Sequence, residues 1–346
     1  MQTVAVSHEQ RLQLSMRSFY QSKTVAVTGG LGLIGSFVCD KLLEQGARVV
    51  VIDDESKGGW TYCEHLRGRV EHRKGTLEDE IFAKEALAGC NVVFHLASKT
   101  CGVGYSSKNH LELLEQNNRV TANVLAAIRQ HPPAHLLMTS SSCVYSDDAP
   151  TPMDDRHPWS GEPEVVNRGY GWAKRFLEQL SQVVCSDLGV CLTIVRPVNV
   201  YGERYHWMGA GSQAIPMLVR RIMEGENPLV IWGSGNQRRS YVHASDCARI
   251  MVELVQVENG AGPINIGCEE TVSVRELALA LALAAGRNIE LAVDTTKPEG
   301  RFLKAADSTR LRDALGNSYG WRVSFEEGMR RMVDWHQVTF SKIWTR

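Results

Sequence analysis

Residues 23–35 read KTVAVTGGLGLIG, and residues 47–54 read ARVVVIDD. The first stretch is a β-branched run followed by a glycine-rich turn and the start of an amphipathic helical pattern over Gly35–Gln45. The second stretch predicts another strand over Ala47–Ile52. Strand, glycine turn, helix and strand in this order predict the first βαβ unit of a parallel sheet.

The same alternation continues along the chain. Apolar runs predict further strands over Lys23–Thr28, Asn91–Leu96, His135–Thr139 and Cys191–Val195, with helical patterns between them. Near-continuous apolar strands separated by amphipathic helices are typical of a sheet covered on both faces. We therefore expect an α/β fold with a doubly wound, Rossmann-type parallel sheet.

The glycine turn has the spacing G-x-x-G-x-x-G through Gly29, Gly32 and Gly35, with Leu33 and Ile34 between the last two. Glycine lets backbone N–H groups approach a pyrophosphate, and the following helix N-terminus favours negative charge. Asp53, about 20 residues after the turn, can bind the ribose hydroxyls of the adenosine and repels a 2′-phosphate. The sequence therefore predicts an NAD site rather than an NADP site.

A candidate catalytic group lies in Tyr170-Gly171-Trp172-Ala173-Lys174, where the tyrosine and the lysine share one face of a helix. An adjacent ammonium favours a phenolate, which can accept the proton of a substrate hydroxyl. The run from Ser140 to Ser142 follows a predicted strand, at the sheet edge where α/β folds bind ligands.

These motifs together resemble the extended short-chain dehydrogenase/reductase family: TGGLGLIG, HLAS (95–98), SSSCVY (140–145), YGWAK (170–174) and RPVNVYG (196–202). The resemblance implies that Ser141, Tyr170 and Lys174 are catalytic, and that Gly29, Gly32, Leu33, Ile34, Gly35, Asp53, Leu96, Ser98, Tyr170 and Lys174 hold NAD. It also implies a nucleotide-sugar substrate bound by Cys101, Gly102, Ser142, Asn199, Gln213, Arg239, Arg301 and Lys304.

Cys143, within SSCVY, and the stretch SKTCGVGY (98–105) resemble the branch that contains GDP-mannose 3,5-epimerase and GDP-L-fucose synthase. The resemblance implies that Cys143 is an acid/base group at C3 or C5 of a 4-keto sugar, and it favours a GDP-sugar. The branch has a second acid/base residue, a Lys or His, where this chain has Gln213. An amide cannot act as a base, which leaves three alternatives. The enzyme inverts only one centre, His206 or another nearby residue substitutes for the missing base, or Cys143 does not perform epimerisation.

These motifs are compatible with two enzymatic functions and one non-enzymatic function. Asp53 and a retained NAD favour an epimerase that oxidises C4 transiently. The alternative is a reductase or dehydrogenase of a nucleotide 4-keto sugar. A remote alternative is a non-catalytic, dinucleotide-binding sensor, against which the complete Ser141, Tyr170 and Lys174 set argues.

After Tyr201 the sequence changes to short segments rich in Gly, Trp and Arg, with helical patterns at Ile215–Met223, Val274–Ala285 and Phe325–His336. We expect residues 1–22 to be an N-terminal extension. Residues 23–200 with about 237–260 should form the NAD-binding domain, and 201–236 with about 261–346 a smaller mixed α/β lobe that binds the nucleotide sugar.

The overall composition argues against nucleic acid, membrane surfaces and metal ions as partners. Lys+Arg 38 against Asp+Glu 39 leaves no charge excess for nucleic acid or a membrane surface. The nine cysteines form no CxxC pair, which favours a reduced, cytoplasmic protein without a metal site. The helical stretch of residues 174–184 carries an apolar stripe, and with the family resemblance it implies a homodimer.

Overall fold

The computed structural model describes residues 19–57, 59–156, 159–208, 212–257, 262–297 and 300–344. Its centre is a seven-stranded parallel sheet in the order β11-β6-β5-β4-β1-β2-β3. The strands are β1 (Thr24–Thr28), β2 (Arg48–Asp53), β3 (Glu71–Lys74), β4 (Val92–His95), β5 (His135–Thr139), β6 (Cys191–Pro197) and β11 (Ile264–Ile266). The expected Rossmann-type sheet is thus confirmed, and the predicted strands agree with the observed ones to within two residues at either end.

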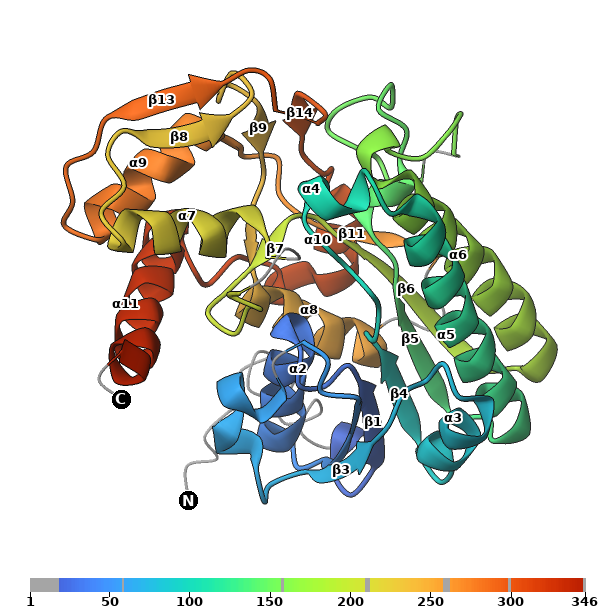
Figure 1. Cartoon of the computed structure of the whole chain (residues 1–346). Coiled ribbons are helices and arrows are strands. Elements are labelled where there is room, and N and C mark those ends of the chain that lie inside the picture. The colour runs from blue at the N-terminus through green and yellow to red at the C-terminus, as the bar shows by residue number, and fades with distance from the viewer. Residues whose placement is uncertain are drawn as a thin grey trace, which may run out of the picture.

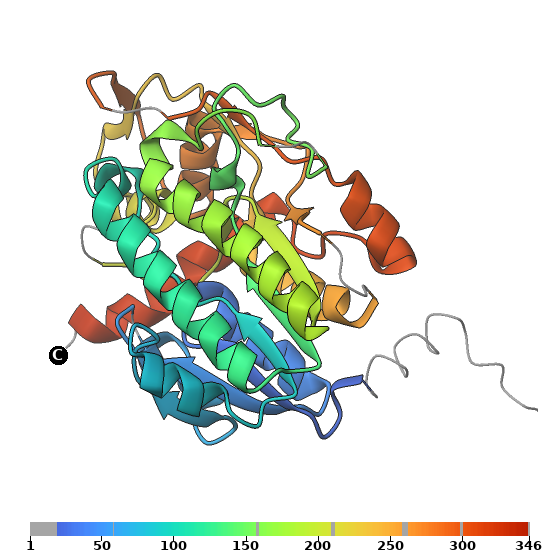
Figure 2. The same cartoon turned by 90° about the vertical axis from the view of Figure 1, so that its right-hand side faces the viewer.

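Helices cover both faces of this sheet because successive residues of each strand point to opposite sides. Val25 and Val27 pack into one core with α2 (Leu33–Glu44), α8 (Ala244–Val257) and α10 (Thr309–Leu315). Ala26 packs into the other core with α3 (Glu80–Leu87), α5 (His110–Gln130) and α6 (Arg168–Leu188). Figure 2 shows α5 and α6 side by side along the outside of the second face.

The strand order reverses between β1 and β4, because the chain runs from β1 to β2 and β3 on one side and then returns to β4 on the other. Loops that leave the carboxyl ends of these two strands diverge and open a crevice, which is the usual ligand site of open α/β sheets. The glycine turn leaves β1 there, and the short helix α4 (Val103–Ser106) follows β4.

The smaller lobe lies above the carboxyl edge of the sheet, as Figure 1 shows. It contains α7 (Ala214–Met223), α9 (Val274–Ala284) and α11 (Phe325–Trp344), which share one apolar core. Its strands are short: β8 (Leu229–Trp232) pairs with β13 (Leu291–Asp294), and β9 (Arg238–Arg239) lies between β12 (Val272–Ser273) and β14 (Leu303–Lys304). A two-stranded ladder of β7 (Val200–Tyr201) and β10 (Val242–His243) completes the described sheets.

The chain crosses between the two units more often than the sequence indicates. β11 lies in the range that we expected in the smaller lobe, but it pairs with β6 and forms one edge of the large sheet. α10, farther along the same range, packs against α8 and the first core. A three-residue strand has too few apolar residues to be separated from a loop by periodicity, which explains the difference.

Short 3₁₀ segments lie in the connections, at Gly59–Tyr62, Glu64–Leu66, Ser142–Val144, Val165–Asn167 and Gly316–Ser318. Of the expected N-terminal extension, residues 1–18 lie outside the described residues. Tyr20 is fully buried, and its hydroxyl donates to the carbonyl of Val252 at 2.9 Å. Among the described residues, no helix combines the length and apolar character needed to cross a membrane.

Candidate active site

A cavity of about 980 Å³ lies between the carboxyl edge of the sheet and the smaller lobe. It brings together most residues that the sequence singled out, although they come from distant parts of the chain. Its walls include Gly29, Gly32, Leu33, Ile34, Gly35, Asp53, Leu96, Ser98, Cys101, Ser141, Ser142, Cys143, Tyr170, Lys174, Asn199, Gln213, Arg239 and Lys304.

The glycine turn forms the floor of the cavity next to β1. Gly29 has a φ of +67°, a conformation that a side chain would strain. A Cβ atom on Gly35 would lie 2.1 Å from the carbonyl oxygen of Gly29, so only glycine permits this close contact between helix and turn. Gly32 is the N-cap of α2, which leaves the first N–H groups of that helix open to an anion.

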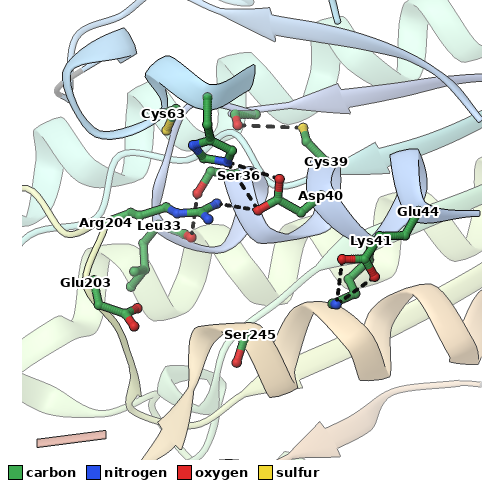
Figure 3. A network of polar contacts seen from close by, with 12 residues as sticks. Leu33, Ser36, Cys39, Asp40, Lys41, Glu44, Cys63, Glu203, Arg204 and Ser245 are labelled. Atoms are coloured by element: carbon green, nitrogen blue, oxygen red, sulfur yellow. Dashed lines mark hydrogen bonds and ion pairs between the residues drawn. The ribbon is translucent and has the colours of Figure 1, made fainter. Parts of the chain in front are cut away.

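Two buried cysteines support the turn from below. The thiol of Cys39 donates to the carbonyl of Gly30 at 3.7 Å, and that of Cys63 to the carbonyl of Leu31 at 3.4 Å. Burial raises the pKa of Cys63 to about 11, so this thiol keeps the proton that it donates. Figure 3 shows both side chains near Ser36 of α2.

Asp53 ends β2 beside the turn. Its carboxylate accepts hydrogen bonds from the N–H groups of Leu31, at 3.0 Å, and Glu55, at 2.8 Å. These bonds fix its orientation in the cavity wall. Turn, helix N-terminus and acid therefore fit the pyrophosphate and ribose of NAD, with Gly32, Gly35 and Asp53 as the holding residues.

Tyr170 and Lys174 lie in the first turns of α6. Burial raises the pKa of Tyr170, and hydrogen bonding with Ser98 and Ser141 partly opposes this rise. Lys174 is 3 % exposed, donates to the carbonyl of Thr139 at 2.8 Å, and has its pKa lowered to about 7 by burial. The tyrosine hydroxyl and two serine hydroxyls thus meet in one wall of the cavity.

Ser98 follows β4 and is positioned by a residue that sequence analysis did not single out. Its hydroxyl donates to Oδ1 of Asn117 at 2.7 Å, and the same oxygen accepts the N–H of Lys99 at 2.9 Å. Asn117 is buried in α5. A polar residue on the inward face of an amphipathic helix was the available signal.

Cys143 sits in the 3₁₀ segment Ser142–Val144, where Ser141 Oγ accepts the N–H of Cys143 at 3.1 Å. Lys304 of β14 reaches the same place, with its Nζ 3.8 Å from the sulfur. It also pairs with the carboxylate of Glu164 at 3.0 Å. Glu164 lines the cavity and was not a candidate from sequence, since it lies in a loop without a recognisable motif.

The loop of residues 202–208 carries further cavity residues over the turn. Arg204 pairs with Asp40 of α2 at 2.8 Å, as Figure 3 shows, and its guanidinium stacks 3.9 Å from the ring of Phe37. This contact ties the smaller lobe to the helix that follows the glycine turn. His206, two residues on, lines the cavity, and its Nδ1 is buried without a hydrogen-bond partner among the described residues.

Two expected substrate contacts are placed differently. The guanidinium of Arg301 donates to the carbonyl of Ser146 at 3.1 Å and to the carbonyl of Ala149. These bonds hold it away from the cavity, and Arg301 is not part of the cavity lining. Gly102 is also outside the lining. A Cβ there would meet the carbonyl oxygen of Ser212 at 2.6 Å, so its role is to let two backbones approach between Cys101 and Gln213.

The aromatic residues of the smaller lobe divide between cavity and core. Tyr205 and Trp232 line the cavity. Trp207 is fully buried and stacks on Trp335, with ring centroids 5.4 Å apart.

Known proteins with similar sequences are nucleotide-sugar enzymes. Putative GDP-L-fucose synthase 2 of Oryza sativa subsp. japonica is 31 % identical over 317 residues, which covers 90 % of this chain and 86 % of the relative. GDP-mannose 3,5-epimerase 1 of the same organism is 25 % identical and covers 92 % and 82 % of the two chains.

A solved structure agrees with these relatives. UDP-glucose 4-epimerase of Thermotoga maritima, determined with UDP-glucose, has a TM-score of 0.81 and 26 % identity and covers 92 % of this chain and 99 % of that one. UDP-glucose 4-epimerase of Thermus thermophilus, in complex with NAD, has a TM-score of 0.78 and 25 % identity, with coverages of 91 % and 99 %.

The family profile described as NAD dependent epimerase/dehydratase matches residues 25–267. This range contains the glycine turn, the serine run and the Tyr170–Lys174 pair, so the expected family, its Rossmann fold and its NAD cofactor are all confirmed. The chain belongs to the NAD dependent epimerase/dehydratase family.

Proposed function

We propose that this protein is a nucleotide-sugar epimerase that oxidises C4 of the sugar transiently and exchanges a proton at C3 or C5 through Cys143. The observation that carries the proposal is that Cys143, Ser141 and Tyr170 line one cavity, which also contains the NAD-binding turn. An epimerase of this kind returns its hydride and needs no external reductant.

In the first step Tyr170 accepts the proton of the C4 hydroxyl, and Ser141 donates a hydrogen bond to the oxygen that becomes the ketone. Bound NAD supplies the hydride acceptor for the C4 hydrogen. Because burial alone favours the neutral phenol of Tyr170, formation of the phenolate relies on positive charge beside it. The oxidised nicotinamide would supply that charge, together with Lys174 in its protonated form, whose Nζ lies 5.5 Å from the centroid of the Tyr170 ring.

A C4 ketone makes the neighbouring C–H bonds acidic, since the carbanion that remains is an enolate. The thiolate of Cys143 removes that proton, the electron pair of the C–H bond passes into the enolate, and the thiol can return a proton to carbon. Burial raises the pKa of Cys143 to about 12 in the protein without ligand, so the thiol form, a proton donor, is its resting state.

Inversion also requires a proton from the opposite side of the sugar. Gln213 cannot supply one. We assign this step to His206, which lines the same cavity and has an unpartnered Nδ1 among the described residues. Imidazole exchanges protons near neutral pH.

The nucleotide diphosphate is the part of the substrate that needs cationic partners. Arg239 lines the cavity in the smaller lobe, and we propose it for this contact. A GDP-sugar is favoured by the relatives named GDP-L-fucose synthase and GDP-mannose 3,5-epimerase.

A second candidate function is reduction of a nucleotide 4-keto sugar. The observation in its favour is that several of the similar proteins are named GDP-L-fucose synthase. The same Tyr170, Ser141 and Cys143 would serve that reaction, but it consumes one reductant for each turnover.

We also propose a cytoplasmic homodimer. Trp172 and Phe176 of α6 are 40 % and 39 % exposed, and Leu111 of the neighbouring α5 is 67 % exposed. Apolar side chains on two adjacent helices suit a contact between two copies of the same surface.

The test is proton exchange in deuterated water. Purified enzyme is incubated with GDP-mannose and a panel of other nucleotide sugars, without added cofactor, and proton NMR follows the C3, C4 and C5 signals. We expect deuterium to enter at C3 or C5 with the wild type and not with Cys143→Ser. The matched control is Cys185→Ser, which alters a buried cysteine of α6 outside the cavity lining. Consumption of NADH or NADPH by a 4-keto sugar, without any exchange, would replace the epimerase by the reductase.

A further inference from the structure

The sulfur of Cys143 faces a positive charge that the sequence placed only among the substrate contacts. Lys304 Nζ lies 3.8 Å from Cys143 Sγ, within hydrogen-bond range for sulfur. The two residues are far apart in sequence and meet because β14 pairs with β9 at the cavity wall. Lys304 is 6 % exposed, so little water competes for its ammonium.

Glu164 fixes that ammonium from the other side. Its Oε2 accepts from Lys304 Nζ at 3.0 Å and from Asn167 Nδ2 at 3.0 Å. Its own N–H donates to the carbonyl of Cys143 at 3.3 Å. Glu164 is 5 % exposed. Backbone and side-chain bonds therefore close a small ring through Cys143, Glu164 and Lys304.

This pair differs from an ordinary buried ion pair because its cation has a second neighbour. Burial raises the pKa of Glu164, but the Lys304 ammonium and the Asn167 amide outweigh it and lower the pKa to about 2. Burial lowers the pKa of Lys304, but Cys143 and the carboxylate of Glu164 beside it leave that pKa above its ordinary value. Both groups are charged at neutral pH, and the ammonium, which has three donors, contacts the sulfur of Cys143 as well as the carboxylate of Glu164.

Three further titratable groups lie close to this ring. Tyr170 and Lys174 of α6 interact electrostatically with Cys143, and Arg239 of β9 interacts with Lys304. Lys174, however, is buried and donates its hydrogen bond to the carbonyl of Thr139, the last residue of β5. Lys304 is the described cation that has a hydrogen-bond contact with the sulfur.

We propose that Lys304 is a positioning residue that stabilises the thiolate of Cys143, and that Glu164 holds its ammonium against the sulfur. The inference rests on the proposed function. It adds the cation that stabilises the thiolate of Cys143, so that the residue can both give a proton to the sugar carbon and remove one from it. When the thiol gives its proton to the enolate carbon, a C–H bond forms, the S–H pair stays on sulfur, and the ammonium of Lys304 compensates the new charge. Proton abstraction from the sugar is the reverse.

The alternative role of Lys304 is to bind the substrate's phosphates or hydroxyls. A lysine with that role alone would change the Michaelis constant for the sugar and leave the ionisation of Cys143 unchanged. The thiol must therefore be measured in the absence of sugar.

The experiment follows the rate of alkylation of Cys143 by iodoacetamide against pH in the NAD-loaded enzyme, read by peptide mass spectrometry. The variants are Lys304→Met, Lys304→Arg, and the double variant Lys304→Met with Glu164→Gln, which leaves no unpaired buried charge. Cys101 lines the same cavity and reports access of the reagent in the same digest.

We expect alkylation of Cys143 at pH 8 to fall at least about tenfold in Lys304→Met, because one pKa unit changes the thiolate fraction about tenfold. The double variant should react at a rate between those of Lys304→Met and the wild type, because the Glu164 carboxylate itself raises the pKa of Cys143 and is lost together with the ammonium. Lys304→Arg keeps the cation and should retain most of the rate. Cys101 should react equally in all four proteins. An unchanged Cys143 profile in Lys304→Met would overturn the inference.

Deuterium exchange on the same preparations separates this inference from the proposed function. A wild-type enzyme whose Cys143 depends on Lys304, but which exchanges no sugar proton, would overturn the proposed function and leave the coupling between the two residues in place. An enzyme that exchanges protons while the Cys143 profile ignores Lys304 would overturn the coupling alone.

Discussion

Glu178 and Arg196 form a bidentate ion pair inside the first domain, with contacts of 2.8 Å and 2.7 Å and side chains that are 1 % and 4 % exposed. Glu178 lies one helical turn after Lys174 on α6, and Arg196 lies near the end of β6. The carboxylate also accepts the hydroxyl of Ser140, next to the proposed catalytic Ser141. The pair therefore fixes α6, which contains Tyr170, against β6 and against the serine run that follows β5.

Replacement of one partner should be costly, because the other charge stays buried. We expect Glu178→Gln to lower the free energy of unfolding by about 3–5 kcal/mol, measured by urea denaturation. Glu44→Gln removes the exposed partner of Lys41 and should cost less than about 1 kcal/mol. Equal effects of the two substitutions would contradict this account of the pair.

Lys174 should give the protein a characteristic pH dependence of stability. Burial lowers the pKa of Lys174 from 10.5 to about 7 in the folded protein. Between these values the unfolded chain binds a proton that the folded chain has lost, so stability rises with pH. Relative to Lys174→Met, wild type should gain stability from pH 7 to 10.5 and be at its weakest below pH 7. Urea unfolding of both proteins at several pH values gives this difference, and a constant difference would refute the assignment.

The glycine turn offers a steric test of cofactor binding. A Cβ at position 35 would lie 2.1 Å from the carbonyl oxygen of Gly29, so Gly35→Ala must displace the turn. We expect the affinity for NAD, measured by calorimetry, to fall at least about tenfold. In Gly262→Ala the nearest atom, on the Arg310 side chain, is 3.8 Å away, so this variant should bind NAD normally. An unchanged affinity of Gly35→Ala for NAD would show that NAD does not bind at the glycine turn.

Motifs local in sequence predicted the dinucleotide-binding half of the site. The turn at Gly29–Gly35 and Asp53 belong to one βαβ unit, so their spacing alone fixes their relation. The serine run follows the end of β5 and Tyr170 lies in the first turn of α6, and the two meet in the wall of the cavity. Of the residues assigned from sequence to catalysis, NAD or substrate, all but Gly102 and Arg301 line the cavity.

The features of the site and fold that could not be predicted from the sequence depend on contacts between segments that are distant in the chain. Glu164 gains its role from Lys304, and these residues meet only after the lobe folds over the sheet edge. Arg301 has the charge expected of a phosphate ligand, but carbonyls of the loop after Tyr145 bind it instead. The three residues of β11 are identified as a strand only by their pairing with β6.

His206 provides a test of inversion separate from proton exchange. If His206 delivers the proton on the second face, His206→Gln should still exchange deuterium through Cys143 but form inverted product at least about a hundredfold more slowly. Proton NMR of the recovered sugar distinguishes exchange from inversion. His131→Gln is the matched control, because His131 is an exposed histidine at the end of α5 outside the cavity lining, and it should invert the sugar at the wild-type rate. Full inversion by His206→Gln would exclude this residue.

The central claim is that the reaction is redox-neutral, with one NAD serving many turnovers. The most direct measurement incubates the NAD-loaded enzyme with its nucleotide sugar, without free cofactor, and follows product by NMR and reduced nicotinamide by absorbance at 340 nm. The proposal predicts many equivalents of epimerised sugar for each bound NAD and no net rise at 340 nm. Product that stops at one equivalent while the absorbance rises in proportion would contradict it and identify a net dehydrogenase.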